Sequence, residues 1–195
     1  MTQKDNSATK SKFYLKPIIN FDHRHAQNRP GKFFIISGSS GVGKNTLLNF
    51  ALARINGLYY LPSITTRSPR EGETQGNPYY FVTVEDFKEM IRAGVFLEWK
   101  RIHGENYYGT HLPTIKYALD NGYRIATDMD VLGCKDAVKV FPQNIVSIFI
   151  IPPSLEDLKM RLMDRDNDPK NIKTRLKRVE MEMKYRSYYD HVIIN

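Results

Sequence analysis

The chain contains 195 residues, of which 41% are hydrophobic and 26% charged, and its formal net charge is +8. These values are ordinary for a soluble globular protein with one domain, or with one domain and a small insertion. The longest notable apolar stretch, residues 146–151, is far too short to span a membrane, so we expect no membrane association. The single cysteine, Cys134, excludes an internal disulfide bond and fits a reducing compartment, so we expect a cytoplasmic protein.

Residues 1–30 predict a polar, flexible N-terminal arm that precedes a folded domain at 31–195. The arm holds six Lys/Arg and two Asp/Glu, which is half of the excess positive charge. It has few aromatic residues and no RNA-binding motif, so we do not expect a nucleic-acid partner. His23 and His25 form an H-x-H without nearby cysteines or a carboxylate cluster, so we interpret them as solvated residues rather than metal ligands.

Strands and helices alternate through the rest of the chain. The apolar and turn patterns predict strands at 32–37, 59–65, 79–82, 96–99, 107–109, 123–129, 144–151 and 190–194, and helices at 44–55, 84–93, 113–121, 135–140, 154–164 and 170–186. Such alternation is typical of an α/β fold with a parallel sheet. The cluster of short strands between 58 and 108 predicts an antiparallel insertion.

A glycine-rich loop separates the first predicted strand from the first predicted helix. It reads Gly38-Ser39-Ser40-Gly41-Val42-Gly43-Lys44-Asn45-Thr46, which contains the pattern G-x-x-x-x-G-K. Glycines let backbone N–H groups turn inward around an anion, and the helix N-terminus adds partial positive charge. The sequence therefore predicts a P-loop that binds nucleotide phosphates, with Lys44 reaching the outer phosphates. Asn45 stands where the pattern usually carries Ser or Thr, so an amide oxygen is the Mg²⁺ ligand offered here.

A second group of polar residues lies in and after the turn-rich segment 66–78. Arg67 and Arg70 are three residues apart, and arginine forks bind phosphate oxygens with two hydrogen bonds. Tyr79 and Tyr108 can donate phenolic hydroxyl groups to the same anion. These four residues predict a second phosphate site, although solvated arginines and core tyrosines are the simpler structural interpretation.

Three carboxylates complete the set of candidate residues. Glu98 lies on a short predicted strand, where it either contacts a ligand or faces water. Asp128 and Asp130 alternate at a strand end, so their side chains face one side, where they either contact a ligand or cap the following turn.

In this order, the motifs resemble those of the guanylate kinase family, over nearly all of residues 31–195. The motifs are G-S-S-G-V-G-K, S-x-T-T-R-x-P-R-x-G-E, F-L-E-W, N-Y-Y-G-T, D-x-D-x-x-G and P-P-S. The resemblance implies a P-loop NTPase three-layer fold with a central parallel sheet, a small mixed GMP-binding insertion and a helical lid. The core would occupy 31–61 and 112–195, the insertion about 62–111, and the lid about 154–178.

The resemblance implies a transfer of the ATP γ-phosphoryl group to GMP or dGMP, with Mg²⁺ as cofactor. The ATP-binding residues would be Ser39, Ser40, Gly41, Val42, Gly43, Lys44, Asn45 and Thr46. The GMP-binding residues would be Ser63, Arg67, Arg70, Tyr79, Glu98, Tyr108, Thr110 and Asp130. The catalytic residues would be Lys44 and the lid arginines Arg161, Arg165 and Arg175, and the metal ligands would be Asn45 and Asp128.

The chemistry of guanine agrees with this assignment. Guanine presents N1–H and N2–H side by side, and one carboxylate such as Glu98 accepts both hydrogen bonds. The hydroxyls of Ser63 and Thr110 can donate to guanine O6. Adenine has no such donor pair and would leave a buried carboxylate unpaired, so rejection can reach about 10⁴-fold. A phosphomonoester has its second pKa near ~6, so the acceptor phosphate is already a nucleophile at neutral pH and needs no general base.

Three residues depart from the family pattern. Asn45 replaces Ser or Thr, Pro78 stands where family members often carry Asp, and Glu105 lengthens the turn that precedes Tyr108. The alternative is a guanylate-kinase-like module that binds GMP or a phosphorylated peptide without efficient catalysis, and Asn45 is the one feature that favours it. Lys44, the intact loop glycines and the lid arginines favour the enzyme.

Overall fold

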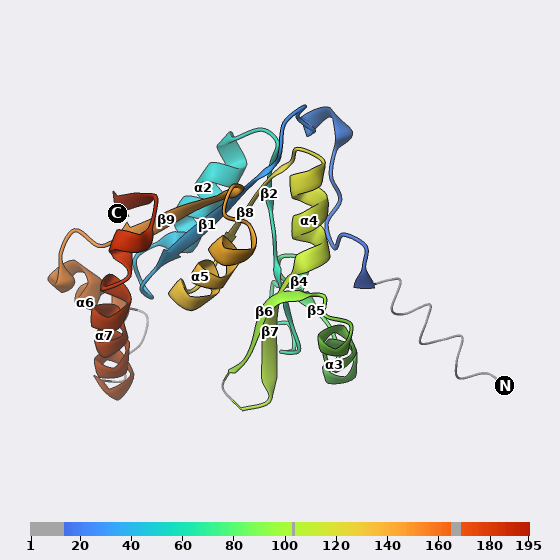
Figure 1. The fold of residues 1–195 in the computed structure, drawn as a ribbon. Helices are drawn as coiled ribbons and strands as arrows, with labels where there is room; N and C mark the ends of the chain where they lie inside the picture. The colour runs from blue at the N-terminus through green and yellow to red at the C-terminus, as the bar shows by residue number, and fades with distance from the viewer. Residues whose placement is uncertain (1–13, 103, 165–168) are drawn as a thin grey trace. The chain divides into compact units, whose positions relative to one another are not determined.

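The computed structural model describes residues 14–102, 104–164 and 169–195, and it divides into two compact units. Unit 1 comprises the described residues up to Lys32 together with Tyr59–Ile125. Unit 2 comprises Phe33–Leu58 and Ala126–Asn195. Figure 1 labels the elements of both units.

The central sheet has five parallel strands in the order β10-β9-β1-β8-β2. They are β1 (Lys32–Gly38), β2 (Leu58–Tyr60), β8 (Arg124–Asp128), β9 (Ile145–Ile151) and β10 (His191–Ile194). Strand β1 pairs with β9 from Phe33↔Ile145 to Gly38↔Ile150, and β10 pairs with the other edge of β9. The predicted central parallel sheet is therefore confirmed.

Two helices of unit 2 cover opposite faces of this sheet. The chain passes from β1 to β2 through α2 (Lys44–Arg54), and from β8 back to β9 through α5 (Val131–Val140). These crossovers run in opposite directions along the sheet, so their common right-handedness puts the helices on opposite faces (Figure 1). Helices α6 (Leu155–Met163) and α7 (Pro169–Met183) then precede β10.

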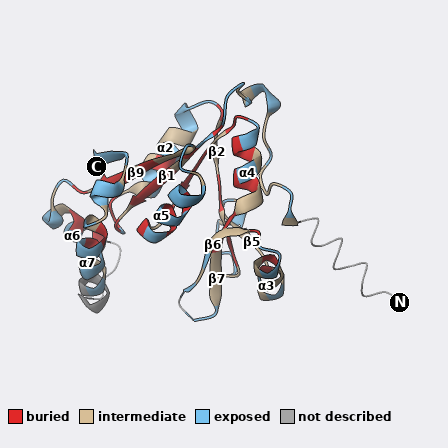
Figure 2. Cartoon of the chain, in the orientation of Figure 1, coloured by how far each residue is buried: buried red, intermediate tan, exposed pale blue. Residues whose placement is uncertain are grey.

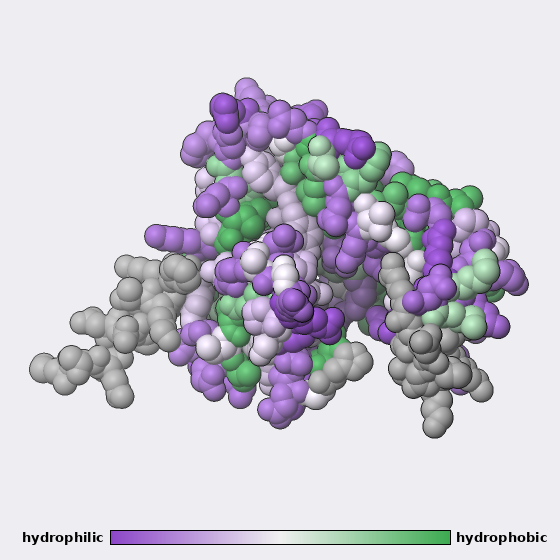
Figure 3. Space-filling model, turned by 180° about the vertical axis from the view of Figure 1, so that it is seen from behind, coloured by the Kyte–Doolittle hydropathy of each residue, from purple (hydrophilic) through white to green (hydrophobic). Residues whose placement is uncertain are grey.

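The core of unit 2 forms where the sheet meets these helices, and Figure 2 shows it as buried stretches of β1 and β9. Its buried side chains include Phe33, Ile35, Ile36, Leu48, Phe149, Ile150, Leu158 and Leu162. Strand β10 is different, because Val192, Ile193 and Ile194 remain 43–68% exposed. Elsewhere the surface seen in Figure 3 is mostly hydrophilic, with separate hydrophobic groups.

Unit 1 contains a second five-stranded sheet, in the order β4-β5-β3-β7-β6. Its strands are β3 (Ser63–Thr65), β4 (Thr74–Gln75), β5 (Pro78–Phe81), β6 (Phe96–Ile102) and β7 (Asn106–His111). Strand β3 is parallel to β5 but antiparallel to β7, so the insertion is mixed and not purely antiparallel. Helix α3 (Val84–Arg92) lies between β5 and β6 in the chain, and α4 (Leu112–Asp120) follows β7.

Some element boundaries differ from the sequence prediction. The single strand expected at 59–65 is two strands in different sheets, separated by Pro62, which has no N–H to donate to a ladder. Helix α5 begins at Val131, four residues before the predicted start, because the Asp130 carboxylate accepts a hydrogen bond from the Gly133 N–H and caps it. Among the described residues, no helix combines the length and apolar character that a membrane crossing requires.

Residues 14–30 differ from the expected flexible arm, whereas residues 1–13 lie outside the described part. The Phe21 ring stacks on Tyr123 at 4.5 Å and meets the Tyr59 ring edge-on at 5.0 Å. The backbone N–H of Asp22 donates to the Tyr59 hydroxyl at 2.8 Å. Segment 27–29 passes directly over Gly122, whose φ is +74° and whose position has no room for a Cβ. Aromatic contacts therefore hold this segment against unit 1, although the segment as a whole is polar.

The two histidines of this segment contact tyrosines. His25 Nδ1 lies 2.8 Å from the Tyr59 hydroxyl, and His23 Nδ1 lies 3.3 Å from the Tyr123 hydroxyl. Within the described ranges, no group of three or more His, Cys, Asp or Glu side chains is arranged to hold a metal ion.

One buried histidine makes stability depend on pH. His111 is the last residue of β7 and the N-cap of α4, its side chain is 0% exposed, and burial lowers its pKa to about 4. Between pH 6.5 and 4 the unfolded chain binds a proton at this histidine that the folded chain does not. The free energy of unfolding should therefore fall by up to about 3 kcal/mol on acidification through this window.

The matched variant is His111→Gln, which cannot titrate. Urea unfolding of both proteins at pH 7 and pH 4.5 measures the effect, because the other titrating groups are common to both. We expect the stability advantage of the native chain over the variant to shrink at pH 4.5. An advantage of equal size at both pH values would contradict the prediction.

Candidate active site

The loop after β1 has the backbone conformation that an anion-binding loop needs. Gly38, Gly41 and Gly43 have φ values of +138°, +88° and +86°, which side-chain-bearing residues rarely adopt. Helix α2 begins directly afterwards at Lys44. The strand, loop and helix therefore lie in the predicted order, with the helix N-terminus at the loop.

Two polar side chains of the loop are placed for an anion. Lys44 Nζ donates to the carbonyl oxygens of Gly38 at 2.7 Å and Ser39 at 3.1 Å, which fixes the ammonium group against the loop backbone. The Ser39 hydroxyl is buried and has no hydrogen-bond partner among the described residues. An unpartnered buried hydroxyl is costly, and a phosphate oxygen is an acceptor that would satisfy it.

The far end of unit 2 contributes a support that sequence reasoning missed. Asn195 Nδ2 donates to the Val42 carbonyl oxygen at 2.8 Å, next to Gly43. The Asn195 backbone oxygen in turn accepts a hydrogen bond from Arg161 Nη1 at 2.9 Å. No sequence signal links Asn195 to the loop, because the contact spans 153 residues and depends on the pairing of β10 with β9.

The three predicted lid arginines have different outcomes. Arg175 of α7 lies near the loop, with Nη1 3.5 Å from the Ser40 hydroxyl oxygen. Arg161 of α6 contacts Asn195 rather than the loop itself. Arg165 lies outside the described residues.

The predicted metal ligands Asn45 and Asp128 both belong to unit 2. Asn45 is exposed in the first turn of α2, and Asp128 is half-buried at the end of β8. They offer one amide and one carboxylate oxygen. Mg²⁺ typically retains several waters and takes phosphate oxygens besides one or two protein ligands, so this small donor set fits it.

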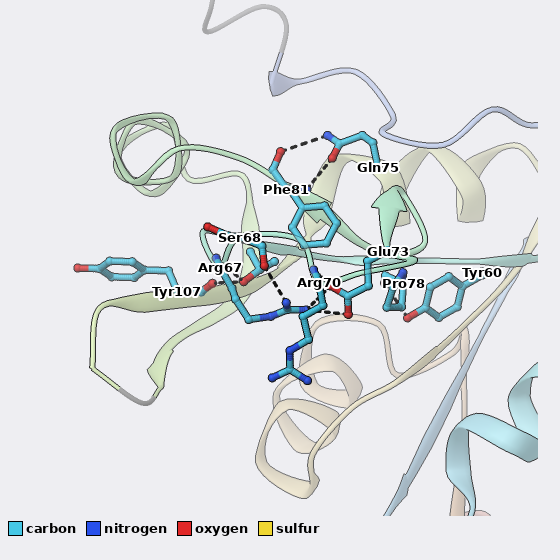
Figure 4. Close-up of polar contacts among 10 residues, drawn as sticks. Tyr60, Arg67, Ser68, Arg70, Glu73, Gln75, Pro78, Phe81 and Tyr107 are labelled. Carbon is cyan, nitrogen blue, oxygen red and sulfur yellow. Dashed lines mark hydrogen bonds and ion pairs between the residues drawn. The ribbon is translucent and has the colours of Figure 1, made fainter.

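The mixed sheet of unit 1 holds most of the second set of predicted residues. Arg67 follows β3, and its Nη2 lies 2.9 and 2.8 Å from the two carboxylate oxygens of Glu73 (Figure 4). Glu73 also accepts the Arg70 N–H at 2.8 Å. Both members of the Arg67–Glu73 pair are mostly buried, at 14% and 17% exposure. Pairing with Glu73 raises the pKa of Arg67, and hydrogen bonds from Arg70 and Arg67 lower the pKa of Glu73.

Tyrosines frame this ion pair. The Arg67 guanidinium lies 5.3 Å from the Tyr79 ring, and Tyr79 and Tyr108 pack edge-to-face at 5.8 Å. Arg70 is exposed, and its guanidinium points away from the Arg67–Glu73 pair (Figure 4). One arginine is therefore held rigidly, while the other extends into the solvent. Glu73 belongs to the motif quoted above, but its role is visible only once the turn brings it to Arg67.

Glu98 and Thr110 form the next pair along the same sheet. They lie opposite each other on β6 and β7, and the Thr110 hydroxyl donates to Glu98 Oε1 at 2.7 Å. Tyr108 and Thr110 are two residues apart on β7, so they face the same side, about 7 Å apart. Ser63 begins β3 and pairs with Tyr79 of β5.

Asp130 belongs to unit 2, whereas the residues above belong to unit 1. Its carboxylate caps α5, which is the structural interpretation left open by the sequence. Its role toward a base stays a prediction.

Comparisons with known proteins give a consistent picture. A family model described as guanylate kinase matches residues 30–195. The chain is 44% identical over 167 residues to a guanylate kinase of Campylobacter jejuni strain RM1221, covering 85% of this chain and 81% of that protein. It is 39% identical over 168 residues to one of Haemophilus influenzae, covering 85% and 80%. A crystal structure of guanylate kinase from Anaplasma phagocytophilum matches with a TM-score of 0.67 and 30% identity, over 86% of this chain and 78% of that one.

The loop geometry predicts that Gly43→Ala weakens the binding of a nucleoside triphosphate. Alanine at φ +86° costs about 1–2 kcal/mol, and its Cβ would overlap the Asn195 amide that holds the loop. We expect triphosphate affinity to fall by about tenfold or more in calorimetric titrations.

Gly94→Ala is the matched control. Gly94 also has a positive φ, +66°, but its surroundings are open, and it follows α3 in unit 1, whereas the loop belongs to unit 2. It should lose similar stability and keep its triphosphate affinity. Equal losses of affinity in both variants would show that general strain, not the loop, is responsible.

Proposed function

This chain belongs to the guanylate kinase family, and we propose that it transfers the γ-phosphoryl group of ATP to GMP, and also to dGMP, giving ADP and the nucleoside diphosphate. The observation that carries the proposal is the alignment of two polar groups on one sheet. The Arg67–Glu73 pair with its tyrosines suits a phosphate, and the Glu98–Thr110 pair beside it suits a guanine base.

In this proposal, Arg67, Arg70, Tyr79 and Tyr108 bind the phosphate of GMP. Arg67 is already oriented by Glu73, so little side-chain entropy is lost when it meets the phosphate. The extended Arg70 supplies a second guanidinium group for the phosphate, and this group is the more mobile of the two. Both tyrosines add phenolic donors, and their rings keep Arg67 in place.

Ser63, Glu98, Thr110 and Asp130 read the base. The Thr110 hydroxyl donates a hydrogen bond to Glu98 in the structure, so its hydrogen is not directed at guanine O6 as the sequence suggested. This bond keeps the Glu98 carboxylate fixed and ready to accept guanine N1–H and N2–H. The proposed hydroxyl contact from Ser63 to guanine O6 completes the edge. Adenine would present an acceptor where Glu98 needs a donor, so AMP should be a poor substrate.

The P-loop holds ATP. Loop amides at Gly41 and Gly43, with residues 39, 40, 42, 45 and 46, surround the phosphates, and the buried Ser39 hydroxyl gains an acceptor. Lys44 exchanges its two carbonyl acceptors for phosphate oxygens. Asn45 and Asp128 are the residues that would hold Mg²⁺, which neutralises charge on the transferring phosphates when bound.

No residue is needed as a general base. The GMP phosphate is largely a dianion at neutral pH, so the chain orients it and neutralises charge on the group being transferred. Lys44 and the arginines Arg161, Arg165 and Arg175 serve this second task. Closure of the proposed lid at 154–178 would exclude water that otherwise hydrolyses ATP.

The test is ADP release from ATP with GMP, dGMP, AMP, UMP or no acceptor, each with Mg²⁺ and again with excess EDTA. Turnover that requires both GMP and Mg²⁺ supports the kinase and shows that Asn45 is tolerated. Tight GMP binding without turnover would instead favour the binding module, whose phosphate site is the same.

Glu98→Ala separates base reading from phosphate binding. We expect the preference for GMP over AMP, measured as a ratio of kcat/KM values, to fall by about 100-fold or more, while the KM for ATP changes little. Equal losses for GMP, AMP and ATP would mean that Glu98 does not read the base.

A further inference from the structure

A segment near the N-terminus is tied to the base-reading end of the mixed sheet. Residues 14–18 precede the part of the chain that the family model matches, residues 30–195. Tyr14 and Ile18 nevertheless pack against the buried cluster of Ile64, Phe87 and Met90 in unit 1. They also line one side of a cavity of about 680 Å³ between this segment, α3 and the sheet. We call residues 14–18 the strap.

His111 and Thr114 connect the strap to the start of α4. His111 Nε2 lies 2.8 Å from the Tyr14 carbonyl oxygen, and His111 Nδ1 lies 2.8 Å from the Thr114 hydroxyl. The Thr114 hydroxyl also accepts the Ile18 N–H at 3.0 Å. His111 and Thr114 are both 0% exposed, so water does not replace these bonds.

The hydrogen-bond acceptors determine which atom carries each hydrogen in this network. A carbonyl oxygen only accepts, so His111 carries its proton on Nε2 and donates it to Tyr14. Nδ1 is then an acceptor, and the Thr114 hydroxyl donates to it while accepting from Ile18. Burial lowers the pKa of His111 to about 4, which keeps the ring neutral as this arrangement requires. Each donor in the chain therefore has one acceptor.

The Tyr14 side chain also binds the strap to α3. The Tyr14 hydroxyl lies 2.9 Å from Asp86 Oδ1 and 3.3 Å from Glu89 Oε2. The strap thus joins α3 to the first turn of α4 within unit 1.

The network is next to the pair that reads the base. His111 follows Thr110 directly on β7 and pairs with Phe96 of β6, and Glu98 pairs with Thr110. A β-bulge lies between Phe96 and Glu98, and bulges set the direction in which the following side chain points. The register that fixes Glu98 against Thr110 therefore depends on how firmly His111 is held at this end.

We propose that His111 and Thr114 are positioning residues for guanine recognition, and that they act by anchoring the strap, residues 14–18, beside the Glu98–Thr110 pair. This role rests on the proposed function, because guanine reading by Glu98 is part of it. It adds a contribution from the strap, which lies outside residues 30–195, the part matched by the family model.

The test uses Thr114→Val, which keeps the shape of the side chain but removes the hydroxyl, and the conservative variant Thr114→Ser, which keeps it. Calorimetric affinities for GMP, IMP and an ATP analogue are measured, with KM values where turnover occurs. We expect Thr114→Val to weaken GMP binding by about 5- to 30-fold. IMP lacks the N2 amine that would donate a hydrogen bond to Glu98, so its affinity should be affected less. The affinity for the ATP analogue should stay within twofold. Thr114→Ser should restore the GMP affinity.

A matched control separates positioning from stability. The Ser147 hydroxyl in unit 2 is also buried and makes two hydrogen bonds with Asp190. Ser147→Ala should lower Tm as Thr114→Val does, but leave GMP affinity unchanged. A second variant that deletes residues 1–18 should reproduce the GMP-selective loss.

Two results would overturn the inference. One is GMP affinity within twofold of the native chain for both Thr114→Val and the deletion. The other is a loss in the same proportion for GMP, IMP and the ATP analogue. Failure of the proposed function looks different, because the unaltered chain would then show no selective GMP binding at all.

Discussion

The burial of β1 in the middle of the central sheet is the constraint on which the nucleotide site depends. Phe33 and Ile35 are fully buried, and β9 pairs with β1 along its whole length. A strand held on both edges ends at a fixed point, so the loop that follows Gly38 has a fixed origin. The crossovers from β1 and β8 also run in opposite directions, which is the arrangement that places ligands at the carboxyl ends of parallel strands.

The mixed sheet meets a different constraint, because it must accommodate charged side chains that are mostly shielded from solvent. Arg67 alone would be a costly cation at 14% exposure, and Glu73 supplies the two acceptors that make it stable. Glu98 is held in the same manner by the Thr110 hydroxyl. Arg67 and Glu98 therefore each have a partner from the chain itself, and their orientation does not depend on a ligand being present.

The order of elements and the P-loop were predictable because strand, loop and helix signals are local in sequence. The residues that were missed act over long separations. Asn195 reaches the loop only through the register of β10, and the strap reaches His111 across 97 residues. The arm at 14–30 was interpreted from its charge, although Phe21 and its tyrosine partners decide where it lies. Asp130 illustrates a different difficulty. A carboxylate that caps a helix and one that binds a ligand have the same sequence pattern, so only the structure reveals that Asp130 caps α5.

The Arg67–Glu73 pair also bears on how the proposed acceptor site would respond to inorganic phosphate. A guanidinium whose charge is already balanced by a carboxylate attracts a lone anion weakly, because the anion must also approach Glu73. In the proposed function, a nucleotide would overcome this through the additional contacts of its base at Glu98 and Thr110. Such a site would discriminate against an ion that carries the correct phosphate but no base, and would keep its acceptor pocket available in a phosphate-rich solution.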